Sequence, residues 1–149
     1  MSLRDANLND IPAIVELWDS TDLLVPWNDP ASDIKNALAT PTCTVLVHEM
    51  SDQLVGTVMV GYDGHRGWVY YLAVRSDYQG LGIGTSLALA AKDWLISHGV
   101  GKMQLMIRKD NLAVAGFYRR LGFQASEVTV MQKVIQPSPT IASNWIKPI

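Results

Sequence analysis

The sequence has a single cysteine, Cys43, and no long hydrophobic run. One cysteine cannot form an intramolecular disulfide and excludes a zinc cluster built on several cysteines, so we expect no metal site. No apolar stretch approaches the roughly 20 residues that a membrane-spanning helix needs. The first residues, MSLRDANLNDIP, also lack the apolar core of a signal peptide. We therefore expect a cytoplasmic protein with no membrane partner.

An excess of positive charge is also missing. Lys and Arg together number 12 and Asp and Glu 14, which gives a net charge of −2. Proteins that bind nucleic acid normally carry a basic excess, so we expect no nucleic-acid partner. Only 17% of the residues are charged and 48% are hydrophobic, which is the reverse of a disordered chain. A chain of 149 residues is long enough for one domain with its own core.

Hydrophobic spacing predicts an α+β (mixed α/β) domain. The expected elements are, in chain order, a strand at 2–5, a helix starting after Asp10, a helix at 32–39 capped by Ser32, strands at 42–49, 54–62 and 67–74, a helix at 84–98, a strand at 102–108, a helix at 111–121, and a last strand or strand pair at 123–134. The middle three strands form an antiparallel meander. The helix at 84–98 is a crossover, which predicts that strands 67–74 and 102–108 are parallel neighbours.

Residues 1–135 are expected to form this domain, and residues 136–149 a proline-containing C-terminal tail. An exposed edge on the last strand together with the apolar tail would suit a homodimer. Regular alternation along strand 67–74 predicts that its side chains divide between two faces. Trp68, Tyr70 and Leu72 would share one face, and Val69, Tyr71 and Ala73 the other.

The strongest local signal is the glycine-rich run Gln79–Thr85 (QGLGIGT), which follows a strand and opens a helix. Glycine allows unusual backbone dihedrals and close approach of a ligand. The first N–H groups of a helix have no partner within it, and the helix dipole places partial positive charge at the same end. Together these features indicate an anion site suited to phosphate. The alternative is that Gly80 and Gly82 serve only a tight turn.

Two common phosphate ligands fit this run poorly. A P-loop needs Gly-Lys-Ser/Thr at its end, whereas Gly84 is followed by Thr85 and Ser86. A dinucleotide fingerprint spaces its glycines as G-x-G-x-x-G within a first βαβ unit, whereas here the third glycine comes one residue early and the run follows a meander. A nucleotide-binding domain using this run remains a rival hypothesis.

Two motifs resemble the GNAT superfamily of acetyl-CoA-dependent N-acetyltransferases. Gln79–Gly84 satisfies the family pattern Gln/Arg-x-x-Gly-x-Gly/Ala, and Tyr71–Val74 is similar to the family's fourth strand. Downstream, Asn111–Phe123 (NLAVAGFYRRLGF) resembles the second family signature. The resemblance covers about residues 3–134 with order and spacing intact. The stretches Tyr62–Trp68 and Pro26–Pro30 resemble in particular the YpeA-like bacterial subgroup.

The resemblance implies a GNAT fold, with a mostly antiparallel sheet, a splayed parallel strand pair and about four flanking helices. It implies transfer of an acetyl group from acetyl-CoA by direct attack of a primary amine, which would belong to a protein N-terminus, a lysine or a small molecule. Tyr118 would donate a proton to the leaving thiolate. Without the resemblance, we would interpret Tyr118 as a core residue and Asn111 as a helix cap. The residues implied to bind acetyl-CoA are Leu72, Ala73, Val74, Gln79, Gly80, Leu81, Gly82, Ile83, Gly84, Thr85, Asn111 and Tyr118.

The sequence departs from well-known branches of this family at the general base. Relatives place a carboxylate where this chain has Trp68 or Met106. Glu49, Asp63 and His65 are the candidates for this base, and each would act directly or through a water molecule. Asp63 and Gly64 are also typical of a hairpin turn. The missing carboxylates give a second rival hypothesis, a non-catalytic module that binds or senses acyl-CoA.

Overall fold

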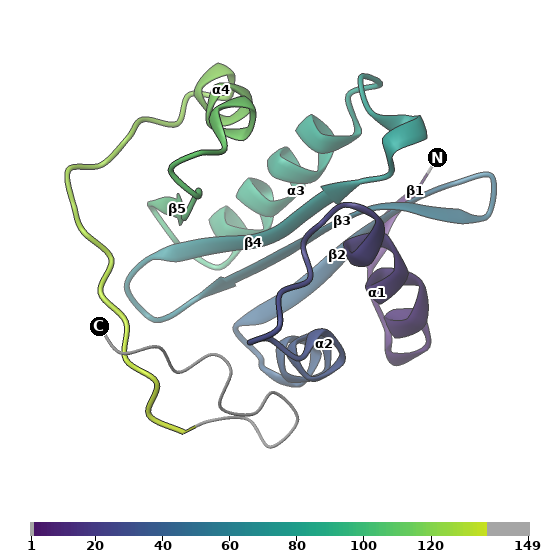
Figure 1. Ribbon diagram of the computed structural model, residues 1–149, viewed down its shortest axis with the longest axis horizontal. Helices are drawn as coiled ribbons and strands as arrows, with labels where there is room; N and C mark the ends of the chain where they lie inside the picture. The colour runs from purple at the N-terminus through teal and green to yellow at the C-terminus, as the bar shows by residue number, and fades with distance from the viewer. Residues whose placement is uncertain (1, 137–149) are drawn as a thin grey trace.

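The computed structural model describes residues 2–136, which form a five-stranded mixed sheet (Figure 1). Its strands lie in chain order: β1 (Ser2–Asp5), β2 (Cys43–Met50), β3 (Gln53–Tyr62), β4 (Gly67–Val74) and β5 (Met103–Leu105). Strands β1 to β4 pair antiparallel, and β4 pairs with β5 in parallel. The predicted fold class and the parallel pair are confirmed.

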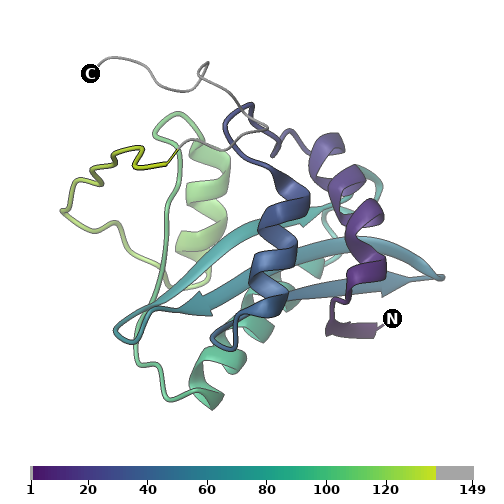
Figure 2. The same ribbon diagram turned by 90° about the horizontal axis from the view of Figure 1, so that it is seen from below.

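Helices cover both faces of the sheet (Figures 1 and 2). α1 (Ile11–Ser20) and α2 (Pro30–Ala39) lie on one face, α3 (Ile83–Ser97) lies on the other, and α4 (Leu112–Arg120) lies near β5. Two short 3-10 turns, at Leu8–Asp10 and Ser76–Tyr78, precede α1 and α3. Within residues 2–136, no helix is long and apolar enough to cross a membrane.

Each helical layer has its own core. Ile14, Leu17 and Trp18 of α1 are fully buried against the inner side of β2 and β3, together with Ile34 of α2. On the other face the buried stripe of α3 packs on the sheet. That stripe is formed by Ile83, Leu87, Ala91 and Leu95.

Helix ends follow local capping chemistry. α2 begins two residues earlier than predicted, because the helix is capped by Asp29 and not by Ser32. The carboxylate of Asp29 accepts the backbone N–H of Ser32, the third helical residue, at 3.2 Å. Pro30 then occupies the first helical position, where its missing N–H costs nothing. Asn111 caps α4 as predicted, accepting the N–H of Val114 at 3.3 Å.

A bulge interrupts β4 at Tyr71. Thr57 of β3 opposes Ala73, but Met59 opposes Tyr70, so two β4 residues stand against Val58 alone. Tyr71 has φ of 53°, in the left-handed region that non-glycine residues rarely adopt. An extra residue of this kind bends the strand and breaks its alternation.

The bulge overturns the predicted assignment of faces on β4. Leu72 packs in the core on the α3 side together with Val69, and not on the face of Tyr70. Tyr71 packs on the α1–α2 side beside Ala73. Tyr70 stays 42% exposed. Strict period-two alternation fails here because the bulge adds one residue to β4 only.

The predicted strand at 123–134 is wrong: residues 123–136 have no regular structure and leave the sheet after α4 (Figure 1). β5 has only three residues, so it offers a short edge for a further strand. Without a sheet face to cover, the side chains of Val128, Val130 and Met131 stay 61–90% exposed. The predicted tail, apart from Gln136, lies outside the described residues.

Candidate active site

The outer edge of β4 is open beyond Val69. β5 pairs with β4 only from Gly67 to Val69. On the inner edge, Arg75 N–H donates to the Val55 carbonyl at 2.8 Å. Backbone groups alternate in direction along a strand, so those of Val74 and Leu72 point away from β3, toward the open side. Both residues are among those predicted to bind acetyl-CoA.

The open edge ends at the glycine loop. Gly80 and Gly82 have φ of 79° and 83°, and a Cβ built on either would meet nothing within 4 Å. α3 begins directly afterwards, and Gly82 at its N-cap provides no side chain to satisfy the first N–H groups. The loop is therefore an uncovered cradle of backbone donors at the positive end of a 15-residue helix.

Gln79 and Leu81 of the same loop are also predicted to bind acetyl-CoA, and their side chains have different surroundings. The side-chain amide of Gln79 donates to the Val74 carbonyl at 3.1 Å, so it ties the loop to the end of β4. Leu81 is 64% exposed at the tip of the loop. Ile83, by contrast, is buried in the core, so that its backbone alone can face a ligand.

α4 lies against the start of α3 and the end of β4. A Cβ on Gly84 would stand 3.4 Å from the ring of Phe117 and 3.7 Å from the Val74 side chain. The structure thus brings the predicted residues of β4 and the loop together with α4. Asn111 is exposed at the N-terminus of α4.

Tyr118 is buried on α4, with 6% of its surface exposed. Its ring packs edge-on against Phe117 and Phe123, with centroids 5.1 and 5.2 Å apart. Burial raises the pKa of its hydroxyl to about 12, so the group stays protonated at neutral pH. Among residues 2–136 this hydroxyl has no hydrogen-bond partner, which leaves its proton available to a ligand.

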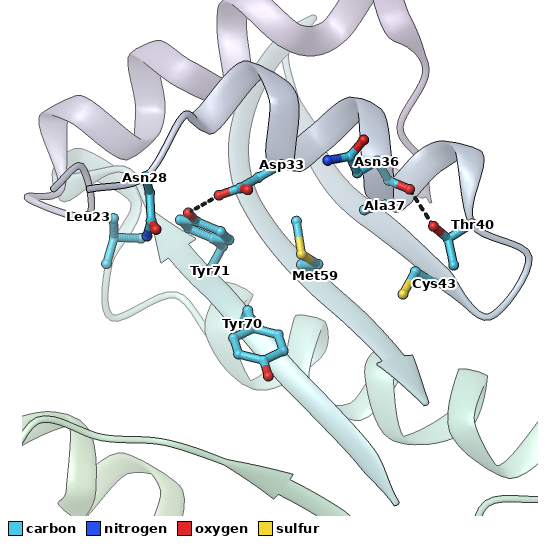
Figure 3. A pocket seen from close by; sticks show the side chains of 10 residues that line it. All are labelled: Leu23, Asn28, Asp33, Asn36, Ala37, Thr40, Cys43, Met59, Tyr70 and Tyr71. Carbon is cyan, nitrogen blue, oxygen red and sulfur yellow. Dashed lines mark hydrogen bonds between the residues drawn. The ribbon is translucent and has the colours of Figure 1, made fainter. Parts of the chain in front are cut away.

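A cavity of about 550 Å³ opens on the opposite face of the sheet, between α2 and β4 (Figure 3). Its lining comes from α2, the loop before it, and strands β2, β3 and β4. The lining residues are Leu23, Asn28, Asp33, Asn36, Ala37, Thr40, Cys43, Met59, Tyr70 and Tyr71. Tyr70 and Tyr71 connect the cavity to the strand whose outer edge is open.

Asp33 and Tyr71 form the polar centre of this cavity. The Tyr71 hydroxyl donates to Asp33 Oδ2 at 2.8 Å, and its ring stacks on Trp18. Burial is the main cause of a raised Asp33 pKa, the Tyr71 hydrogen bond opposes it, and the charge of Asp29 adds to it. Burial and Asp33 also raise the pKa of the Tyr71 hydroxyl, so it stays protonated.

The three candidate bases from the sequence do not line the cavity. Glu49 is ion-paired with Arg4 of β1. Asp63 accepts the backbone N–H groups of His65 and Arg66 in the β3–β4 hairpin; these bonds lower its pKa and make it a weaker base. Trp68 and Met106 supply no carboxylate, and Met106 is 51% exposed.

Sequence reasoning missed Asp33 and the role of Tyr71. The spacing of Asp33, Asn36 and Thr40 at i, i+3 and i+7 does mark one face of a helix, next to the buried stripe of Ile34 and Ala37. That mixed polar stripe was the available signal. The stripe does not show, however, that this face of the helix covers β4.

Within residues 2–136, no group of three or more His, Cys, Asp or Glu side chains is placed to hold a metal ion.

Comparison with known proteins decides the family. Residues 11–123 match the model of the acetyltransferase (GNAT) family. The chain belongs to that family. An acetyltransferase of Pectobacterium atrosepticum is 41% identical over 137 residues, which cover 91% of this chain and 97% of the relative. Such bacterial relatives are YpeA-like, so the narrower resemblance is confirmed too.

Solved GNAT structures confirm the fold. An aminoglycoside 6′-N-acetyltransferase of Acinetobacter haemolyticus superposes with a TM-score of 0.75 at 19% identity, over 91% of this chain and all of that one. A predicted acetyltransferase of Clostridium acetobutylicum, solved with acetyl-CoA, gives a TM-score of 0.74 at 18% identity, over 89% and 95%. The family match and the relative that is 41% identical show that this chain is an acetyltransferase.

Proposed function

We propose that this GNAT acetyltransferase takes its acetyl group from acetyl-CoA and transfers it to a primary amine by direct attack. The observation that carries the proposal is the open edge of β4, which runs into an uncovered glycine loop with α4 beside it. A long, thin ligand with an anionic group at one end fits such an arrangement. The family match and the relative solved with acetyl-CoA support the same ligand.

The pantetheine arm would add to β4 as an extra strand. Its amides would bond the outward backbone groups of Leu72 and Val74, with Ala73 between them packing inward. Because Gln79 already donates to the Val74 carbonyl, the Val74 N–H is the group left for the ligand. The diphosphate would lie on the N–H groups of residues 80–85, including Thr85. Asn111 would reach the pantetheine from the start of α4.

The reaction needs a neutral amine, since its lone pair attacks the thioester carbonyl carbon. The new C–N bond forms as the C–S bond breaks, and the thiolate of CoA takes the proton of Tyr118. The amine gives up a proton to water, and that proton restores the tyrosine. Because burial raises the pKa of Tyr118 to about 12, the phenol does not ionise at rest and still holds its proton when the thiolate leaves.

The acceptor would enter from the α2 side, because Tyr70 and Tyr71 line the cavity on one face while the neighbouring residues of β4 carry the open edge. The bulge at Tyr71 lies between the cavity on that face and the open edge of β4. An amine in the cavity and an acetyl group at the edge would thus approach one another across the bulge.

The test is release of CoA thiol from acetyl-CoA by the purified protein, with mass spectrometry of the product. The panel holds alkylamines, diamines, a peptide with a free N-terminus, and an N-blocked peptide with one lysine. We expect amine-dependent thiol release and an N-acetylated product with at least one member. Saturable acetyl-CoA binding without thiol release against the whole panel would overturn the proposal.

A further inference from the structure

The cavity between α2 and β4 carries one formal charge. Among the described residues that line it, Asp33 alone has an ionised side chain at neutral pH, and none is Lys, Arg or His. The other titratable groups there are Cys43, Tyr70 and Tyr71, and burial raises the pKa of each, so all three stay neutral. The site therefore favours a cationic group and opposes an anionic one.

Asp33 is held away from the strand that carries the open edge. Its Oδ2 atom accepts from the hydroxyl of Tyr71, so the length of a phenol side chain separates the carboxylate from the β4 backbone (Figure 3). Trp18 fixes that side chain, because the two rings stack with centroids 3.7 Å apart and planes within 5°. A nitrogen bound to Asp33 is consequently not the nitrogen that lies beside the bulge.

We propose that Asp33 binds a second, positively charged nitrogen of the acceptor, and that the acceptors are small diamines or polyamines. The inference rests on the proposed function, because it assigns the substrate class of that site. Asp33 recognises the far ammonium group, and Tyr71 positions the carboxylate. The near nitrogen, at the β4 bulge, is the one that reacts.

The state of the Asp33 carboxylate fits this role. Half-buried and beside Asp29, it forms no ion pair with a Lys, Arg or His among residues 2–136. A partly buried charge without a counterion is costly, and an ammonium group from the ligand removes that cost. Tyr71 occupies Oδ2, so Oδ1 is left to accept from the ligand.

The rest of the cavity suits a methylene chain. Met59 of β3 and Ala37 of α2 provide apolar lining near Asp33, and Leu23 lies at the end near Asn28 (Figure 3). Tyr70 points away from α2 in the same view. A cavity of about 550 Å³ is large enough for a small amine together with its solvent.

The experiment compares three compounds of matched length: 1,4-diaminobutane, n-butylamine and 4-aminobutanoate. They share the reacting amine and differ at the far end, which is cationic, neutral or anionic. Calorimetry on the protein with CoA bound gives affinities, and thiol release gives kcat/KM. We expect the diamine to exceed butylamine by about tenfold or more in both, and 4-aminobutanoate to be the weakest.

Variants then assign the preference to Asp33. D33N should lower affinity and kcat/KM for the diamine by about tenfold and leave those for butylamine within about twofold. D19N is the control, because Asp19 is exposed on α1 and its loss changes net charge equally. Y71F keeps the stacked ring and should give a smaller loss for the diamine than D33N. Thermal melts confirm folding, and Y71F carries the test if D33N does not fold.

Three outcomes would overturn the inference: equal binding of diamine and butylamine, an equal effect of D33N on both, or no diamine binding. Butylamine turnover with no diamine advantage would remove this inference and leave the proposed function intact. Diamine binding that depends on Asp33 but gives no thiol release would overturn the proposed function, and Asp33 would be left as a binding site for an ammonium group and not for an acceptor substrate.

Discussion

The indole ring of Trp18 lies flat on the phenol ring of Tyr71, with the two planes within 5°. The same indole donates its N–H to the Thr57 hydroxyl at 2.9 Å, and that hydroxyl donates to the Tyr71 carbonyl at 3.0 Å. Helix α1 thus fixes both the side chain and the backbone of the bulge residue. A left-handed tyrosine is strained, and this buried network is what holds it in place.

Removing the hydroxyl at the centre of this network should be costly. Thr57 is fully buried, and T57V keeps its shape but removes the acceptor of the Trp18 N–H and the hydroxyl donor to the Tyr71 carbonyl. We expect a loss of about 3 kcal/mol in the free energy of unfolding, measured by urea denaturation. T21V is the control: Thr21 donates to the Leu17 carbonyl at the end of α1, where water can replace it. Equal losses in the two variants would remove the structural role of Thr57.

The glycine loop can be tested against a glycine of the same geometry elsewhere. Gly82 and Gly99 have φ of 83° and 76°, at opposite ends of α3, and an added Cβ meets nothing within 4 Å at either. Alanine should cost both variants about 1 kcal/mol of stability through backbone strain. Only G82A places a methyl group in the cradle, so only G82A should weaken acetyl-CoA binding, by about tenfold. Calorimetry that finds equal affinities for G82A and G99A would contradict the placement of the diphosphate.

Asn111 is predicted both to cap α4 and to bind acetyl-CoA, and two variants distinguish these roles. N111A loses the cap of α4 and should cost about 1 kcal/mol of stability. N111D keeps an equally good capping oxygen but loses the amide donor and adds a negative charge. If Asn111 also binds pantetheine, N111D should be as stable as the wild type and bind acetyl-CoA more weakly. Undiminished affinity in N111D would reduce Asn111 to a cap.

Tyr118→Phe tests the general acid. The ring packing on Phe117 and Phe123 is kept, so acetyl-CoA affinity should stay within about twofold. Thiol release should fall by about a hundredfold, the usual scale for loss of a positioned proton donor. Y62F is the matched control, because Tyr62 packs beside Trp94 and His98 at the other end of α3. Full turnover in Y118F would remove the assignment.

The raised pKa of Tyr118 also predicts a change in stability at high pH. An unfolded tyrosine loses its proton near pH 10, whereas the folded chain keeps this one until about pH 12. This contribution to stability is complete below about pH 10 and is lost as the pH rises toward 12. Between about pH 9 and about pH 11 the wild type should therefore lose more free energy of unfolding than Y118F. Parallel curves from urea denaturation would show that the hydroxyl is not buried as described.

Much of the fold could be predicted because local chemistry and tertiary packing agree. The meander, the crossover helix α3 and the cap at Asn111 all follow from short-range patterns that the structure keeps. The glycine loop was predicted for the same reason, because its positive φ values are a local conformational property of glycine. The roles of the residues predicted to bind acetyl-CoA stay predictions.

What could not be predicted depends on contacts between distant residues. The bulge at Tyr71 depends on Trp18 and Thr57, which are 53 and 14 residues earlier in the chain, and no local pattern announces it. Asp33 became a candidate only when α2 was placed over β4. The expected last strand failed because an alternating sequence needs a partner edge, and β5 is too short to give one.

The most direct test of the account is calorimetric titration of the purified protein with acetyl-CoA, with CoA, ATP and NAD as comparators. The open edge of β4 and the glycine loop predict saturable binding of acetyl-CoA and CoA, with one site per chain, and weaker binding of ATP and NAD. Absence of acetyl-CoA binding in a protein shown to be folded, or tighter binding of ATP or NAD, would contradict the account.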